Sequence, residues 1–359
     1  MSESAIGLST AMKGFRTPAV CILAGFAVFR GEIAVAQQEA PASRSAQSVY
    51  QEQHALFNSN FTLESGLSYT RSDRKQLALN GFLALDAIFL GNISVDQVKA
   101  DILTLDETAR WGVTPRLQMD LDVPFLYRRT VYQSAGAGGS SQAVSEETVR
   151  LERPMEVGDV SAGVYYQLAP ETASRADIVW NLRIKAPTGT NPYGIKTVTS
   201  PDNSSLTVPE YLPSGNGVWA ASTGFSFVKT VDPAILFANI GYFYNRPQDF
   251  NDINSADGNQ PGTIKLGDSF QYGVGTAFAF NETTSLSLSF VHRLTAKSRV
   301  RTDASGWQNI IGSDANAATL NFGLTHALSD KTSMVFGLGI GLTPDAPNMT
   351  VGIKFPYNF

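Results

Sequence analysis

Charged and amide side chains recur at every second position of several otherwise apolar segments. The residues that share this setting are Arg116, Asp120, Asp122, Asn181, Arg183, Lys185, Arg293 and Lys354. Side chains at every second position of a strand point to the same face, so each segment would carry its charges on one face and its apolar side chains on the other. Because both signs occur, facing segments can pair these charges or surround a charged solute with them.

Catalytic and metal chemistry find little support in the other polar residues. The chain has 3 histidines, and a hydrolase would need a serine beside one of them. Ser287 and Ser289 fall on the opposite face of their segment from His292. The loop 249–258 is rich in carboxylate and amide oxygens, but not at EF-hand spacing, so a solvated loop is favoured over a calcium site. The sequence predicts no enzyme, no catalytic residue, no metal and no cofactor.

The segments that carry the charges are predicted to be strands. Segments 117–127, 160–168, 178–186, 236–244 and 270–280 alternate apolar with small or polar residues. A length of about ten residues suits a tilted strand that crosses a membrane. Only 16% of the residues are charged, which is too few for a soluble sandwich with a solvated outer face. The pattern predicts an all-β fold, an antiparallel transmembrane β-barrel over residues 61–359 with its charges turned inward.

The connections alternate in length. Tight polar turns occur at 112–115, 230–233, 281–283 and 329–332. Long stretches rich in Gly, Ser, Asn, Asp and Pro lie between them, at 129–157, 189–216, 247–268 and 299–315. Short turns on one rim and long loops on the other are typical of outer-membrane barrels.

The N-terminus predicts export. Lys13 and Arg16 precede an apolar run, 19–29, and Ala34-Val35-Ala36 offers a cleavage site, so residues 1–36 are predicted to be a secretory signal peptide. Residues 37–60 are predicted to form a flexible periplasmic segment, with a short helix or plug at 48–58 as the alternative. The net charge of −5 and the lack of basic runs argue against a nucleic-acid partner.

The last eleven residues alternate strictly, with Phe355, Tyr357 and Phe359 on the apolar face. This pattern favours the closing strand of a barrel, whose terminal aromatic residues act as an assembly signal for the barrel-assembly machinery. The last strand of a soluble sheet is the alternative.

The number of strands is predicted to be about twelve, with fourteen possible, because an even number keeps both termini on one side. The sequence offers one candidate too many, and segment 61–70 is predicted to lie outside the barrel, while 76–90 is predicted to be a barrel strand. The apolar phase of 96–111 shifts from even to odd positions, which predicts a β-bulge.

Three runs together resemble a known pattern: 104–127, 158–168 and Lys185-Ala-Pro-Thr-Gly189. They are similar to outer-membrane channels of the phenol-degradation MetA type, in which a strand ending Tyr-Gly-Leu-Thr leads into one ending Val-Pro. Trp111 and Val113 depart mildly from that pattern. The resemblance covers residues 97–359 and implies a channel for small aromatic or hydrophobic solutes, without catalytic residues.

The predicted function is therefore an outer-membrane channel for small solutes, placed among outer-membrane lipid, with oligomers possible. The alternative is a secretion channel for an exported polypeptide such as an amyloid subunit. For the charged lumen, an open pore with a selectivity ring and a self-neutralised, filled interior both remain open.

Overall fold

The computed structural model of the chain describes residues 47, 50–54, 57, 61–75, 79–84, 87–93, 97–134, 147–199 and 207–359. The chain divides into two units, Met1–Gln37 and Gln38–Phe359, and every described residue belongs to the second. The predicted signal peptide and most of segment 37–60 lie outside the described residues. In the part that is described, no helix is long and apolar enough to cross a membrane.

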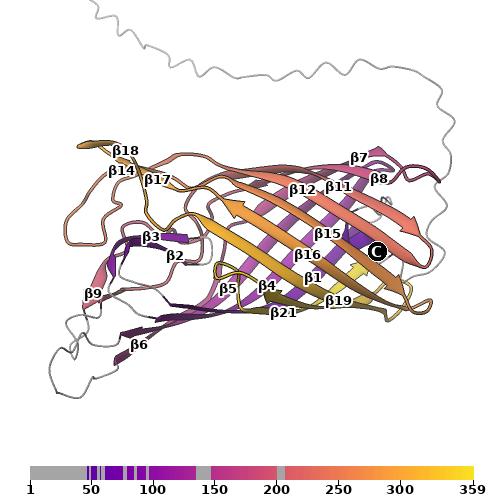
Figure 1. The fold of residues 1–359 in the computed structure, drawn as a ribbon, viewed down its shortest axis with the longest axis horizontal. Helices are drawn as coiled ribbons and strands as arrows, with labels where there is room; N and C mark the ends of the chain where they lie inside the picture. Colours follow the sequence, from indigo (N-terminus) through magenta and orange to yellow (C-terminus); the bar gives the residue numbers. More distant parts are fainter. Residues whose placement is uncertain are drawn as a thin grey trace, which may run out of the picture. The chain divides into compact units, whose positions relative to one another are not determined.

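Antiparallel strands close into one barrel of twelve strands (Figure 1). In ring order they are β4 (Gln97–Thr114), β1 (Phe61–Lys75), β21 (Met349–Asn358), β20 (Ser333–Gly341), β19 (Ala315–Ala327), β16 (Thr284–Thr295), β15 (Ser269–Ala279), β12 (Ala234–Asn245), β11 (Ala220–Val231), β8 (Asp177–Lys185), β7 (Ser161–Ala169) and β5 (Leu117–Ser134). Pairing of β4 with β5 closes the ring, and β6 (Glu147–Val157) adds a further strand beside the second half of β5. The predicted all-β barrel of about twelve strands is confirmed.

The identity of the first barrel strand differs from the prediction. Segment 61–70 belongs to β1, which pairs with β21 on one side and β4 on the other. Segment 76–90 is not a barrel strand, because β2 (Leu79–Ala84) and β3 (Ala87–Ile93) form a separate two-stranded sheet. The outward side chains of β1 explain its place: Phe61, Leu63 and Leu67 are exposed on the outer face, as a membrane-facing strand requires.

The predicted bulge in 96–111 is wrong. The register of β4 against β1 runs without a break from Gln97 to Trp111. The apolar phase changes because the environment of the inner face changes along β4. Val98 and Ile102 point inward and are buried, and Val98 packs against Tyr132 and Ile195 near the long-loop end. Hydrophobic residues therefore face inward there without any change of register.

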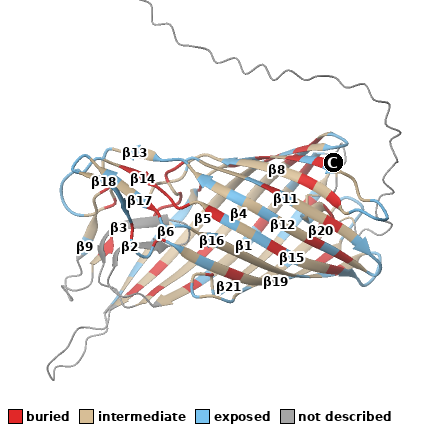
Figure 2. Cartoon of the chain, turned by 45° about the horizontal axis from the view of Figure 1, so that its top comes forward, coloured by how far each residue is buried: buried red, intermediate tan, exposed pale blue. Residues whose placement is uncertain are grey.

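Alternation along each strand separates an apolar outer face from a small or polar inner face. On β5, Met119 and Leu121 are exposed, while Gln118 and Asp120 are buried. Figure 2 shows the result as short buried blocks spaced along the strands. An exposed apolar surface of this extent suits hydrocarbon, and a closed ring leaves no unpaired backbone edge in it.

The two ends of the barrel differ as predicted. Tight turns join β4 to β5, β11 to β12, β15 to β16 and β19 to β20 at one end, here called the short-turn end. The long connections at the other end, the long-loop end, carry strands of their own: β9 (Thr197–Thr199), β10 (Thr207–Pro209), β13 (Gln248–Phe250), β14 (Gly262–Lys265), β17 (Arg299–Thr302) and β18 (Ser305–Asn309). Strands β13, β14, β17 and β18 form one sheet beyond the barrel wall (Figure 1).

Candidate functional site in the barrel lumen

A buried ion pair joins β5 to β8 inside the lumen. Arg183 Nη2 donates to both carboxylate oxygens of Asp120, at 2.8 and 2.7 Å. The same guanidinium donates to Ser161 Oγ at 2.6 Å and to Tyr165 Oη at 2.8 Å. The Asp120 side chain has no exposed surface, and that of Arg183 is 30% exposed. These two predicted charges therefore neutralise each other.

Two further predicted cations have acidic partners that the sequence did not reveal. Lys185 Nζ lies 3.5 Å from Asp159 Oδ2, and Lys354 Nζ lies 3.2 Å from Glu64 Oε1. Asp159 precedes β7, and Glu64 lies on β1, the strand that was predicted to be outside the barrel. In the register of β1 with β21, Lys354 lies opposite Gly66, so Glu64 is its diagonal neighbour on the inner face.

Three further predicted lumen residues are Asn181, Asp122 and Arg116. Asn181 follows the same face of β8 as Arg183. Asp122 accepts a hydrogen bond from Thr108 Oγ1 at 3.0 Å. Arg116 is exposed in the turn between β4 and β5, outside the lumen wall.

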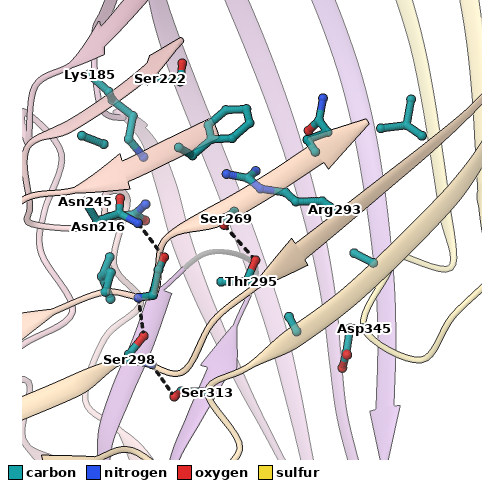
Figure 3. A pocket seen from close by; sticks show the side chains of 18 of the residues that line it. Lys185, Asn216, Ser222, Asn245, Ser269, Arg293, Thr295, Ser298, Ser313 and Asp345 are labelled. Carbon is teal, nitrogen blue, oxygen red and sulfur yellow. Dashed lines mark hydrogen bonds between the residues drawn. The ribbon is translucent and has the colours of Figure 1, made fainter. Parts of the chain in front are cut away.

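A cavity of about 500 Å³ opens in the lumen toward the long-loop end (Figure 3). Arg293 lines it from β16, and its guanidinium carbon lies 4.2 Å from the ring centroid of Phe243 on β12. The buried Leu266 and the buried Ser298 and Ser313 line the same cavity. Figure 3 shows the hydrogen bond between these serines. The cavity, which we call the loop-side cavity, thus combines apolar walls with basic side chains.

The short-turn end of the lumen is occupied by residues from before the barrel. Tyr50 is 3% exposed and packs in a cluster with Val179, Val228 and Phe237, whose side chains point inward. Its hydroxyl is hydrogen-bonded to Glu171. It also lies 2.7 Å from Thr230 Oγ1.

Glu171, the hydrogen-bond partner of Tyr50, is held by further hydrogen bonds at the short-turn end. Glu171 Oε1 accepts a hydrogen bond from Lys229 Nζ at 3.0 Å and one from the Thr230 backbone nitrogen at 2.8 Å. Burial tends to raise the pKa of Glu171, but the hydrogen bonds from Tyr50 and Lys229 outweigh it and hold the pKa below its usual range. Burial and Glu171 raise the pKa of Tyr50.

The residues that follow Tyr50 contact other parts of the barrel wall. The His54 ring stacks on Tyr165, with centroids 4.1 Å apart, and Glu52 accepts a hydrogen bond from Thr325 at 2.7 Å. Burial lowers the pKa of His54, and the positive charges of Arg110, Arg183 and Lys354 lower it further. A smaller cavity of about 230 Å³ lies beside Glu52, His54, Arg110 and Lys354. Residues 50–54 therefore contact both β7 and β19, and we call them the lumen segment.

The lumen segment belongs to stretch 37–60, for which a flexible segment was predicted, with a short helix or plug at 48–58 as the alternative. One signal was visible in the sequence: Tyr50 and Phe57 are the only Phe, Trp or Tyr residues in that Gln- and Ala-rich stretch. Phe57 packs against the same inward cluster as Tyr50. Without knowledge of the inward apolar patch, these aromatic residues had no visible partner.

The loop 249–258 gathers its oxygens around a side-chain ammonium. Lys196 Nζ donates to Asp252 Oδ2 at 2.8 Å. It also donates to the backbone oxygens of Ala256 at 2.8 Å and Gly258 at 2.7 Å. Among the described residues, no group of three or more His, Cys, Asp or Glu side chains is arranged to hold a metal.

The predicted assembly signal lies on the outer face of β21. Phe355, Tyr357 and Phe359 are exposed. Phe359 contacts Tyr357 and also Phe61 of the neighbouring strand, with ring centroids 4.9 and 5.5 Å apart. These aromatic residues form a cluster at the short-turn end, where the first and last strands meet.

The closed ring, the apolar outer face and the polar lumen define a transmembrane β-barrel. No family model matches the sequence. The chain is similar to the COG4313 outer-membrane channel from Pseudomonas putida F1, with a TM-score of 0.51 and 15% identity over 85% of this chain and 97% of that one. This likeness shows the fold and confirms the predicted resemblance to outer-membrane channels.

Two other solved barrels are also similar. The CymD monoaromatic hydrocarbon channel matches with a TM-score of 0.42 and 10% identity, over 89% of this chain and 94% of that one. The translocator domain of the autotransporter NalP from Neisseria meningitidis matches with a TM-score of 0.47 and 6% identity, over 87% and 93%.

Proposed function

We propose that this protein is a channel that passes small solutes with apolar or aromatic bodies across the bacterial outer membrane. The observation that supports this best is the loop-side cavity of about 500 Å³, a size that suits a small molecule. Phe243, Leu266 and Val291 give it apolar walls, and basic side chains give it a few polar anchor points. This combination is what small-molecule sites generally offer.

The residues that occupy the lumen favour a small solute over a polypeptide. The Asp120–Arg183 pair and the lumen segment both take up space inside the ring. Export of a polypeptide, the alternative, requires the lumen segment to leave and the ion pair to be bypassed. A small solute needs only the space beside them.

The proposed setting is the outer membrane, with the long-loop end outside the cell. The apolar outer face would contact lipid, and the cluster of Phe355, Tyr357 and Phe359 would be recognised by the barrel-assembly machinery. The protein should partition with outer membranes and migrate faster unheated than boiled on a denaturing gel. Recovery as a soluble periplasmic protein would contradict this setting.

Liposome swelling tests the proposed transport. Protein refolded into liposomes should admit small neutral solutes at rates that fall steeply with solute size, and planar bilayers should show discrete conductance steps. A second protein lacking residues 37–60 should show larger steps, because the lumen segment is gone. If both proteins fold, as judged by gel migration, but neither conducts, the barrel is a filled structure and not a channel. If only the truncated protein conducts and it also threads an unfolded peptide, the export alternative is favoured.

A further inference from the structure

The loop-side cavity collects more basic than acidic side chains. Its basic lining residues are Arg74, Arg183, Lys185 and Arg293. Among its described lining residues the one carboxylate is that of Asp345, and this group accepts a hydrogen bond from the backbone nitrogen of Asn316 at 2.8 Å. A low-dielectric wall strengthens the field of such an excess, so the cavity attracts anions.

Arg293 differs from Arg183 and Lys185 in having no acidic partner among the described residues. Arg183 is bound to Asp120, and Lys185 lies near Asp159. Among the described residues, Arg293 forms no ion pair, and its Nε is buried without a hydrogen-bond partner. Phe243 covers its guanidinium in a cation–π contact, which holds the group in place without neutralising it. A fixed, unpaired guanidinium facing a cavity is suited to an anionic ligand.

We propose that the loop-side cavity binds small organic acids, with Arg293 holding the carboxylate and Lys185 adding a second positive charge. The proposal rests on the proposed channel function and specifies its substrate class. The planar fork of an arginine matches the two oxygens of a carboxylate. In Figure 3 the ends of Lys185 and Arg293 both point into the cavity, so one anion can interact with both.

The rest of the cavity fits an apolar body attached to that carboxylate. Leu266 is 5% exposed and lies with Phe243 and Val291 along the lining. An inorganic anion would leave these apolar walls unused, and a neutral aromatic solute would leave Arg293 unpaired. A compound such as benzoate satisfies both the apolar walls and Arg293, since its ring contacts the walls while its carboxylate binds the guanidinium.

A second arginine with unbonded side-chain nitrogens, Arg110, lies further into the lumen. Arg110 is 6% exposed, and neither its Nε nor its Nη1 has a hydrogen-bond partner among the described residues. It pairs in register with Asp120 across β4 and β5 and lines the smaller cavity beside His54. Glu52 and Glu64 also line that smaller cavity, so it lacks the basic excess of the loop-side cavity.

Benzoate and benzyl alcohol, which share the ring and differ in charge, test the proposal. Binding to the folded protein would be measured by calorimetry, and entry by swelling of liposomes. Benzoate should bind at least about tenfold more tightly than benzyl alcohol, the difference expected from one charge-assisted hydrogen-bonded contact. Arg293→Gln should abolish that difference, and Arg293→Lys should retain part of it, because it keeps the charge but loses the fork. Lys331→Gln, in the exposed turn between β19 and β20, removes a charge elsewhere and serves as the matched control.

The outcomes separate the two levels of the proposal. If neutral solutes enter the liposomes but benzoate has no advantage, or keeps its advantage in Arg293→Gln, the organic-acid site is refuted and the channel stands. If no solute enters at all, the channel itself is refuted. Gel migration shows whether each variant folds. If Arg293→Gln does not fold, Arg293→Lys is compared with the wild type instead.

Discussion

Removing one partner of the Asp120–Arg183 pair is expected to destabilise the barrel more than removing both. Arg183→Met leaves the Asp120 carboxylate with no exposed surface and without its two hydrogen bonds of 2.8 and 2.7 Å. Breaking a buried pair in this way costs about 3–5 kcal/mol. Asp120→Asn should cost less, about 1–3 kcal/mol, because Arg183 is 30% exposed and keeps Ser161 and Tyr165 as acceptors.

The double variant Asp120→Leu with Arg183→Met removes both charges and should lie within about 1–2 kcal/mol of the wild type. Urea unfolding of the barrel in lipid vesicles, followed by tryptophan fluorescence and gel migration, measures all three changes. Lys354→Met is the control: its side chain is 55% exposed, so loss of its ion pair should cost no more than about 1 kcal/mol. If the double variant loses the sum of the two single losses, the two charges do not interact as the geometry indicates.

Four further predictions concern the lumen and the wall. Tyr50→Phe keeps the ring but loses the hydrogen bonds to Glu171 and Thr230, so open conductance events should become more frequent in planar bilayers, and Tyr50→Ala should increase them further. The docked lumen segment holds His54 with a lowered pKa, so it binds fewer protons than the released segment. Docking should therefore be strongest above the free histidine pKa of about 6.5 and weaken as the pH falls below it. Conductance should rise over the same pH range, and His54→Gln should remove this rise. Ile353→Lys, on the outer face of β21, should sharply lower the folded yield in vesicles, whereas Lys354→Ala should be tolerated, and equal yields would contradict the assignment of faces. Neutralising Arg183 and Lys185 should shift the reversal potential toward cation selectivity, and neutralising Asp120 and Asp122 should shift it toward anions; indifference to both would favour a filled interior.

The outer face of the barrel was readable from the sequence because lipid imposes one rule on every strand. A charged side chain at mid-membrane costs roughly 2–4 kcal/mol on that face, so apolar residues must recur with period two. The strand β12 obeys this rule, with Leu236, Ile240 and Tyr242 all exposed. The same rule predicts that Arg183 and Lys354 face inward.

The inner face follows no such rule, and the errors in the predictions arose there. Val98 and Ile102 face inward and are buried, and Val98 packs against the loop residues Ile195 and Val208. This change of apolar phase was taken for a bulge. The Glu64–Lys354 pair depends on which strand closes the ring, a choice made by long-range pairing of β1 with β21. The place of Tyr50 depends on an apolar patch assembled from several strands. Each of these is a contact between distant segments, which local periodicity does not encode.

The contacts of the lumen segment explain how an occupied barrel can still act as a channel. Burial of Tyr50 contributes roughly 2 kcal/mol, its hydrogen bond to the Glu171 carboxylate about 1.5–3, and the His54 stacking about 1. Ordering the backbone of residues 50–54 opposes this by roughly 1 kcal/mol for each residue. The terms cancel to within about 1 kcal/mol, so the released state is readily accessible. The hydrogen bonds between the described residues of the lumen segment and the barrel all join side chains, so their release leaves the backbone pairing of the ring intact. The barrel can therefore remain folded while the segment leaves, and solute passage would depend on an equilibrium that a single residue such as Tyr50 can shift.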